Sequence, residues 1–309
     1  MTASITRFEA GDSAAIRNYY RENGYVVVGQ LLSDAKIDRL LEILEQKKSA
    51  RFFVFKSQDT HLPMQPRLTP EGFLENSMLN PGNLKLAPGF ARAVESCVTD
   101  EAVSELLTVL SGAPGHVMRQ TMLFYQSTGT IEHQDHYYLD SDPPGNMIAA
   151  WYALEDIHED AGCFFVLPGS HKGRLIERQG RDYADHEEYR HAIGALIEEA
   201  RYEYLTLPLR KGDVLFWHPY TIHGADKNQN PRHSRKSVTA HFIPRTMASF
   251  YGEKYPQARP SMNPHITIHG GSAYPYWDSV KSYIRFAANI VRRRGPHMVM
   301  RREHYGERA

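Results

Sequence analysis

Hydrophobic and polar positions follow two periods along this chain, one in the first third and another in the middle. In residues 1–114 the apolar spacing predicts helices over 13–24, 34–48 and 99–112 and a short β-branched strand over 25–32. Ser33 and Thr99 are the candidate N-caps of the second and third helices. This part is therefore expected to form a helical support.

From residue 115 onward the pattern changes to brief segments that are rich in β-branched and aromatic residues and bounded by Gly, Pro, Asn or Asp. Strands are predicted over 116–127, 146–154, 162–170, 204–209, 213–219 and 237–244. Close spacing of such strands favours a sandwich or an open barrel over alternating β/α units.

Two segments depart from this strand pattern. Residues 172–204 form a charged, partly helical insertion, and we consider equally a solvated loop and a lid over the mouth of the barrel. Residues 278–295 place Val280, Ile284, Ala287 and Val291 on one helical face. We expect a single domain over 1–309, with a β core over 115–245 and a C-terminal helical extension over 246–309.

Composition limits the class of protein. The 309 residues are 41% hydrophobic and 23% charged, and the 36 basic residues balance the 36 acidic ones. This balance favours neither nucleic acid nor a membrane surface as a partner, and a small-molecule substrate is expected instead; homo-oligomerisation stays open. There is no apolar run of spanning length and no secretory signal pattern, and only Cys97 and Cys163 are present. A reduced, cytoplasmic setting is the prediction. The 16 histidines are the unusual count.

Two polar side chains follow the predicted strand 116–127 and a glycine-containing turn. His133 and Asp135 are two residues apart, so on an extended backbone both point to one side, whereas Gln134 and His136 point away. A solvated turn explains such a pair equally well unless a further ligand supports it.

The segment 212–225, GDVLFWHPYTIHGA, offers that ligand. His223 would complete a set of two imidazoles and one carboxylate, while His218, inside the strand, is expected to pack. Such a set occupies one face of an octahedron and is typical of non-haem Fe(II) oxygenases. A zinc site, which usually has cysteine or a third histidine, is the alternative.

A 2-oxo acid bound to such a metal needs a cation for its far carboxylate, and the planar fork of arginine suits this role. Arg235 precedes the strand that would return beside the metal. Arg232 and Lys236 are its competitors, and spacing alone favours Arg235 only slightly.

Several blocks in order resemble the phytanoyl-CoA dioxygenase family of Fe(II)- and 2-oxoglutarate-dependent oxygenases. They are YYRENGYVVVGQLLSD, HQD, AAWYALEDIHEDAGCFFVLPGSHKG and KGDVLFWHPYTIHGADKNQNPRHSRKSVTAHF. The resemblance spans most of the chain. It implies a mainly β fold with flanking helices around a double-stranded β-helix core, the cupin-like jelly roll.

The resemblance also assigns residues. His133, Asp135 and His223 match the iron ligands, and Arg235 matches the partner of the far carboxylate of 2-oxoglutarate. The expected further contacts with the cosubstrate are Trp151, Met122 and Lys85, which the resemblance implies, and Gln134. We place the aromatic residues Tyr137 and Tyr138 at the substrate mouth. Core packing is an equal reading for Trp151 and for the two tyrosines.

Two departures from the family pattern stand out. Ala225 replaces a serine that often contacts 2-oxoglutarate, and the segment between Asn228 and Arg235 is one residue longer. The implied reaction uses Fe(II), 2-oxoglutarate and O2 to oxidise a substrate C–H bond, with release of succinate and CO2. Hydroxylation is the expected outcome, and desaturation, epoxidation or ring formation in a biosynthetic pathway is the alternative. A non-catalytic barrel that binds a metal or small ligand is the alternative of another class.

Overall fold

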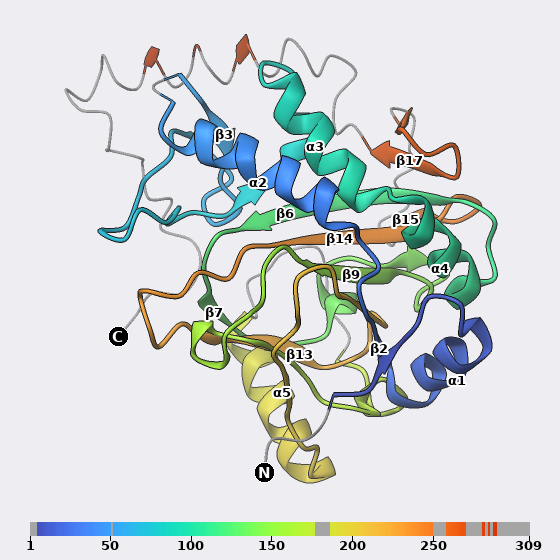
Figure 1. Ribbon diagram of the computed structural model, residues 1–309. Helices are drawn as coiled ribbons and strands as arrows, with labels where there is room; N and C mark the ends of the chain where they lie inside the picture. The colour runs from blue at the N-terminus through green and yellow to red at the C-terminus, as the bar shows by residue number, and fades with distance from the viewer. Residues whose placement is uncertain are drawn as a thin grey trace.

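The computed structural model (Figure 1) describes residues 5–50, 52–176, 186–249, 258–269, 280–281, 284 and 287–288. The α-helices in these ranges are α1 (Ser13–Asn23), α2 (Asp34–Lys48), α3 (Pro88–Val98), α4 (Glu101–Ser111) and α5 (His186–Ala200). None of the described helices is long and apolar enough to cross a membrane.

The largest sheet holds nine strands, in the order β1 (Arg7–Phe8), β2 (Tyr25–Val28), β12 (Val214–Trp217), β9 (Ile148–Ala153), β14 (Ser237–Pro244), β6 (His116–Phe124), β17 (Ile266–His269) and β16 (Ala258–Pro260), with β5 (Met78–Leu79) also pairing with β6. A second sheet has the order β11 (Leu205–Leu207), β10 (Phe164–Val166), β13 (His223–Lys227) and β7 (Thr128–His133). Two small ribbons pair β3 (Phe55–Lys56) with β4 (Pro63–Met64) and β8 (Ser141–Asp142) with β15 (Ala248–Ser249).

Alternation along the large sheet divides its side chains between two cores. On one face, Trp151 and Leu215 pair across β9 and β12 and pack against Phe164 and Val166 of the smaller sheet. The two sheets therefore face each other, and a second apolar layer covers the other side of the large sheet (Figure 1).

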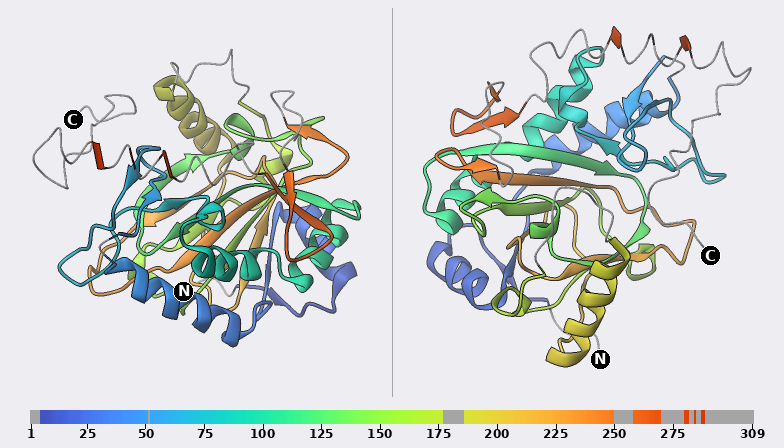
Figure 2. Two further views of the ribbon diagram at one scale, coloured as in Figure 1. Left: turned by 90° about the horizontal axis from the view of Figure 1, so that it is seen from above. Right: turned by 180° about the vertical axis from the view of Figure 1, so that it is seen from behind.

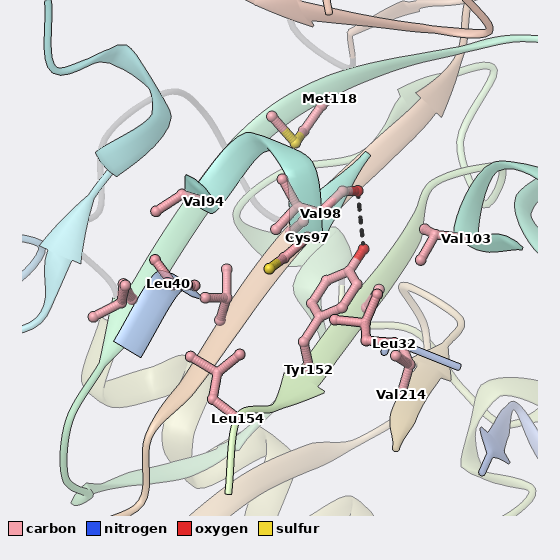
Figure 3. Packing of buried hydrophobic residues seen from close by; sticks show 14 of the residues in the cluster. Leu32, Leu40, Val94, Cys97, Val98, Val103, Met118, Tyr152, Leu154 and Val214 are labelled. Carbon is pink, nitrogen blue, oxygen red and sulfur yellow. Dashed lines mark hydrogen bonds between the residues drawn. The ribbon is translucent and has the colours of Figure 1, made fainter. Parts of the chain in front are cut away.

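The helices form this outer layer. Figure 3 shows Val94, Cys97 and Val98 of α3 packed over Tyr152 of β9, whose hydroxyl donates a hydrogen bond 3.3 Å long to the Val98 carbonyl oxygen. In contrast, α5 lies beside the smaller sheet, away from α2 and α3 (Figures 1 and 2). Helices therefore pack on the outer face of each sheet.

Most predicted elements are confirmed. All six strands predicted from residue 115 onward contain an observed strand, and α1, α2 and α4 match the three predicted helices. Gly24 ends α1 in the left-handed conformation (φ 78°), as expected for a helix stop. The N-cap of α4 is Asp100 and not Thr99, because the Asp100 carboxylate accepts the N–H of Ala102.

The remaining segment predictions have mixed outcomes. The insertion contains α5, and residues 177–185 within it lie outside the described residues. Most of the helix predicted over 278–295 also lies outside them. Cys97 and Cys163 are both buried and free.

Candidate metal and cosubstrate site

The pairing of β7 with β13 brings the three candidate ligands together. His133 ends β7 and lies directly opposite His223, the first residue of β13. The strand stops there, since Asp135 begins a 3-10 turn, η2 (Asp135–Tyr137). Gln134 is still extended (φ −105°, ψ 128°), so the alternation expected from the sequence holds for one more step and Asp135 faces the same side as His133.

The ligand atoms surround one point. Oδ1 of Asp135 lies 3.6 Å from Nε2 of His133 and 3.6 Å from Nε2 of His223. Adjacent ligands of a six-coordinate ion with bonds of about 2.1 Å are about 3 Å apart, so a small inward movement would let all three bind one ion. The three residues thus fit one face of a metal's coordination sphere.

Hydrogen bonds to the outer atoms hold these ligands in place. Nδ1–H of His133 donates to the Ile131 carbonyl oxygen (2.8 Å), and Nδ1–H of His223 donates to that of Thr221 (2.9 Å). These bonds place the ring proton on Nδ1 and leave the Nε2 lone pair free for a metal.

The carboxylate is oriented in the same way. Nε1–H of Trp217 donates to Oδ2 of Asp135 across 2.8 Å, and Nε2 of His241 lies 3.6 Å from the same oxygen. Oδ1 is therefore left as the metal-facing atom.

The protonation states suit metal binding. Burial lowers the pKa of His223 to about 3, with Asp135 opposing this effect. Burial would raise the pKa of Asp135, but the imidazoles of His223, His133 and His241 together hold it well below its usual range. For His133, burial lowers the pKa, and the Asp135 carboxylate more than offsets this, so that its pKa is raised. At neutral pH the set therefore offers the ionised carboxylate of Asp135 and the neutral imidazole of His223, the forms in which these side chains bind a metal.

Arg235 is buried beside this cluster. It is 3% exposed, and its Nε and Nη1 atoms have no hydrogen-bond partner. Its guanidinium carbon lies 5.6 Å from the ring centres of both Phe124 and Trp151. A buried cation with unpartnered N–H groups is costly unless an anion completes it, so the arrangement fits a bound carboxylate.

The two other cations considered for the role of Arg235 are an ion-paired lysine and an exposed arginine. Lys236 forms an ion pair with Glu155 (2.7 Å), and Arg232 is exposed. Burial thus distinguishes the three cations, which spacing could not do.

The neighbouring cosubstrate candidates lie on the same face of the large sheet. Trp151 and Met122 both pair with Thr239 of β14, from either side of that strand. Ala225 faces Phe164 of β10 and carries no hydroxyl, as the sequence showed.

No described contact joins Lys85 to the cluster, so its role stays a prediction. Its pKa is lowered by burial and by Arg259, with Glu95 of α3 opposing, which places it in the helical layer. Its proposed contact with 2-oxoglutarate receives no support from this position.

Gln134 points away from the ligands, as the alternation predicted, and forms hydrogen bonds with residues of the insertion 172–204 and with Tyr220. Its side-chain N–H groups donate to the carbonyl oxygens of Tyr220 (3.0 Å) and Arg174 (3.4 Å), and its backbone N–H donates to the hydroxyl of Tyr189 in α5 (2.8 Å). It therefore ties the metal segment to the insertion, and no described contact joins it to Arg235.

The two tyrosines differ in their surroundings. Tyr137 is 4% exposed and stacks on Tyr189 at 3.7 Å between ring centres. Tyr138 is partly exposed, and its ring meets that of His133 edge-on at 5.7 Å. Tyr138 thus contacts the candidate ligand His133, while Tyr137 packs under α5.

The other histidines of these segments lie away from the cluster. His136 pairs with Asp140 through Nδ1 (2.7 Å). His218 lies just after β12, which ends at Trp217, and not inside the strand as expected; it lines a cavity of about 420 Å³ together with Tyr20 and His171. Both outcomes agree with the prediction that neither is a ligand.

Sequence reasoning missed Trp217, His241 and Phe124. For His241 a signal existed, because alternation from Arg235 along the strand 237–244 turns residues 237, 239 and 241 toward the same face. Trp217 and Phe124 carried no such signal, since their roles depend on contacts between strands.

This arrangement of two facing sheets, a His–Asp–His set and a buried arginine defines a non-haem iron enzyme, a 2-oxoglutarate-dependent dioxygenase. The family model "Phytanoyl-CoA dioxygenase (PhyH)" matches residues 20–237. The chain belongs to this family, as the resemblance of its motifs indicated.

Relatives agree with the assignment. The peroxisomal phytanoyl-CoA dioxygenase of Homo sapiens is 30% identical over 247 residues, which cover 73% of this chain and 67% of the relative. The corresponding enzyme of Bos taurus is 29% identical over 238 residues, with the same coverage of both chains.

Solved structures show the same fold at low identity. The epimerase SnoN in complex with Fe3+, alpha ketoglutarate and nogalamycin RO is 20% identical, with a TM-score of 0.59 and coverage of 84% of this chain and 96% of that one. EctD from S. alaskensis, with 2-oxoglutarate and 5-hydroxyectoine, is 17% identical, with a TM-score of 0.55 and coverage of 84% of both chains.

Proposed function

We propose that this protein hydroxylates an unactivated C–H bond of a small-molecule metabolite, with His133, Asp135 and His223 as the iron ligands. The observation that carries the proposal is the buried Arg235, whose Nε and Nη1 have no hydrogen-bond partner. Its guanidinium lies over Trp151, in the same core as Phe164, whose ring stacks on His223. A simple metal-binding barrel needs no such cation. The facing sheets support a jelly-roll core, and the continuous match over 20–237 supports one catalytic unit.

Each residue has a distinct part in the proposed reaction. When bound, Fe(II) and 2-oxoglutarate supply the oxidation, in which O2 is consumed and succinate and CO2 are released. Trp217 keeps the Asp135 carboxylate turned toward the metal, and Arg235 orients the cosubstrate by pairing with its far carboxylate. Trp151 and Met122 line the cosubstrate space, and the partly exposed Tyr138 contacts the substrate at the mouth.

The substrate class follows from what fits such a site. SnoN and EctD, which share the fold, are described with nogalamycin RO and 5-hydroxyectoine, both small molecules. No concentrated basic patch for the phosphates of coenzyme A is evident in the sequence, which favours a substrate other than an acyl-CoA.

The test is succinate formation from 2-oxoglutarate with Fe(II), ascorbate and a metabolite extract. We expect His133→Ala and Asp135→Ala to abolish it. Arg235→Gln should raise the KM for 2-oxoglutarate by about 10-fold to 100-fold, the range for losing hydrogen bonds to a charged group. Arg232→Gln is the matched control, because this neighbouring arginine is exposed, and its KM should stay at the wild-type value.

Mass spectrometry of the extract separates the outcomes. A product heavier by one oxygen supports hydroxylation, whereas a product lighter by two hydrogens points to desaturation or ring formation. If the protein binds metal but consumes no 2-oxoglutarate, the proposal is refuted and the alternative function, a non-catalytic barrel that binds a metal or small ligand, is supported.

A further inference from the structure

A second group of metal-ligating side chains lies outside the site described above. His158, Asp160 and His233 each offer one ligand atom, and these atoms lie within 4.8 Å of one another. Oδ1 of Asp160 is 2.6 Å from Nδ1 of His158 and 2.6 Å from Nδ1 of His233. The two imidazole rings are 4.0 Å apart between centres.

Two loops supply this group. His158 and Asp160 belong to the connection between β9 and β10, at the turn η3 (Glu159–Ala161). His233 belongs to the connection between β13 and β14, which also carries Arg235 two residues later.

The hydrogen bonds around the group leave its centre in need of a positive charge. The backbone N–H of Asp160 donates to Nδ1 of His158 (3.5 Å), and Nδ2 of Asn230 lies 3.3 Å from Nδ1 of His233. Each Nδ1 also faces Oδ1 of Asp160 at 2.6 Å, so either a proton on the ring nitrogen or a metal ion between the two atoms offsets the repulsion of their lone pairs.

A hydrogen bond also orients the Asp160 carboxylate for metal binding. Nδ2 of Asn230 donates to Oδ2 of Asp160 (2.9 Å), which leaves Oδ1 to face the imidazoles.

The donor set selects the kind of ion. Imidazole nitrogens suit Zn²⁺, Co²⁺, Ni²⁺ and Cu²⁺, whereas Ca²⁺ and Mg²⁺ prefer sites made of oxygen alone. The side chains of His158, Asp160 and His233 are 59%, 33% and 37% exposed, so solvent reaches the group and water can complete the coordination. Tetrahedral ligands of zinc are about 3.3 Å apart, so each imidazole must move about 0.7 Å away from Oδ1 of Asp160, which side chains on exposed loops can do.

We propose that His158, Asp160 and His233 bind one divalent transition-metal ion, such as zinc, at a site separate from the iron cluster. Because the ligands come from two loops, the bound ion cross-links them and holds residues 228–235 in place. The site therefore braces the segment that delivers Arg235. This inference does not depend on the proposed oxidation.

The test is zinc stoichiometry on the full chain, prepared without a histidine tag and stripped with a chelator. Equilibrium dialysis followed by elemental analysis should give two zinc ions per chain for the wild type, since zinc also fills the first cluster. Asp135→Ala should retain one ion, and the double variant His158→Asn/His233→Asn should likewise retain one. The triple combination should bind none. His191→Asn, an exposed histidine of α5, is the matched control and should keep both ions.

A second readout tests the brace. In the Asp135→Ala background, zinc should slow amide hydrogen exchange over 228–235, and the added His158→Asn/His233→Asn substitutions should remove this protection. A wild-type stoichiometry of one, or two ions retained after His158→Asn/His233→Asn, would overturn the site. Binding without any protection of 228–235 would overturn the brace. Normal circular dichroism of each variant shows that the chain is folded.

Discussion

The hydrogen bond from Trp217 to Asp135 offers a direct test of how the second layer of residues controls the metal site. Trp217→Phe keeps an aromatic ring between the sheets but removes the only N–H of the indole. In the wild type this group donates to Oδ2 of Asp135 across 2.8 Å, and both residues are buried. The substitution therefore leaves the ligand present and takes away its orientation.

The expected magnitude follows from the charge and the burial. A hydrogen bond to a charged group contributes about 1.5–3 kcal/mol, and loss of an outer partner of a metal ligand typically weakens metal binding by about 10-fold to 100-fold. Nε2 of His241 lies 3.6 Å from the same oxygen and can replace part of the lost bond. We therefore expect the lower end, an affinity decrease of about 10-fold, and a larger decrease when His241→Asn is added.

The assay is anaerobic titration calorimetry with Fe(II) or Co(II). It is run in the His158→Asn/His233→Asn background, so that only the first cluster binds. Trp151→Phe is the matched control, because Trp151 is an equally buried tryptophan of the same core that makes no described bond to a ligand. If Trp217→Phe binds metal as tightly as Trp151→Phe does, Trp217 only packs and the reasoning is refuted.

Two further predictions concern stability. Burial, with Arg245 adding to it, lowers the pKa of His116 to about 4. The pKa of His116 in the folded chain is thus below its value of about 6.5 in the unfolded chain, so the unfolded chain binds the proton first as the pH falls. The free energy of unfolding should therefore decrease by about 3 kcal/mol between about pH 6.5 and about pH 4. Urea unfolding across this range should show a shallower acid loss in His116→Asn, and an unchanged slope would contradict the assignment. Gly162 has φ +83°, and an added Cβ would lie 2.4 Å from the Asp226 carbonyl oxygen, so Gly162→Ala should lose about 3 kcal/mol or more in thermal unfolding. Gly129→Ala shares a positive φ (+87°) but meets no atom closer than 3.4 Å, so it should lose only about 1 kcal/mol; equal losses would rule out the backbone clash.

Much of the fold could be predicted from the sequence because the local hydrophobic patterns match the burial of the helices and strands in the folded chain. Strands such as 237–244, which is buried on both faces, could be predicted because they are short segments rich in β-branched and aromatic residues. α3 was missed because its Pro88–Gly89 start reads as a break, although proline is well tolerated in the first turn of a helix. β7 was read as a turn because its residues are mostly polar and exposed, and only the pairing with β13 makes it a strand.

The candidate site divides in the same way. Residue type and a spacing of two residues pointed to His133 and Asp135 as candidate ligands, and the order of the motifs pointed to His223 and Arg235 as candidates. Only the tertiary structure decided which cation is buried and which groups orient the ligands, because Arg232, Arg235 and Lys236 are equivalent in spacing but differ in burial and partners. Lys85 could not be placed from sequence, since its surroundings depend on how the helical layer packs. The His158–Asp160–His233 group also exists only through folding, because 73 residues separate Asp160 from His233 along the chain. The sequence itself contains the short-range periodicity that predicts helices and strands. The meeting of side chains that are distant in sequence depends on strand pairing and loop packing, which no local pattern specifies.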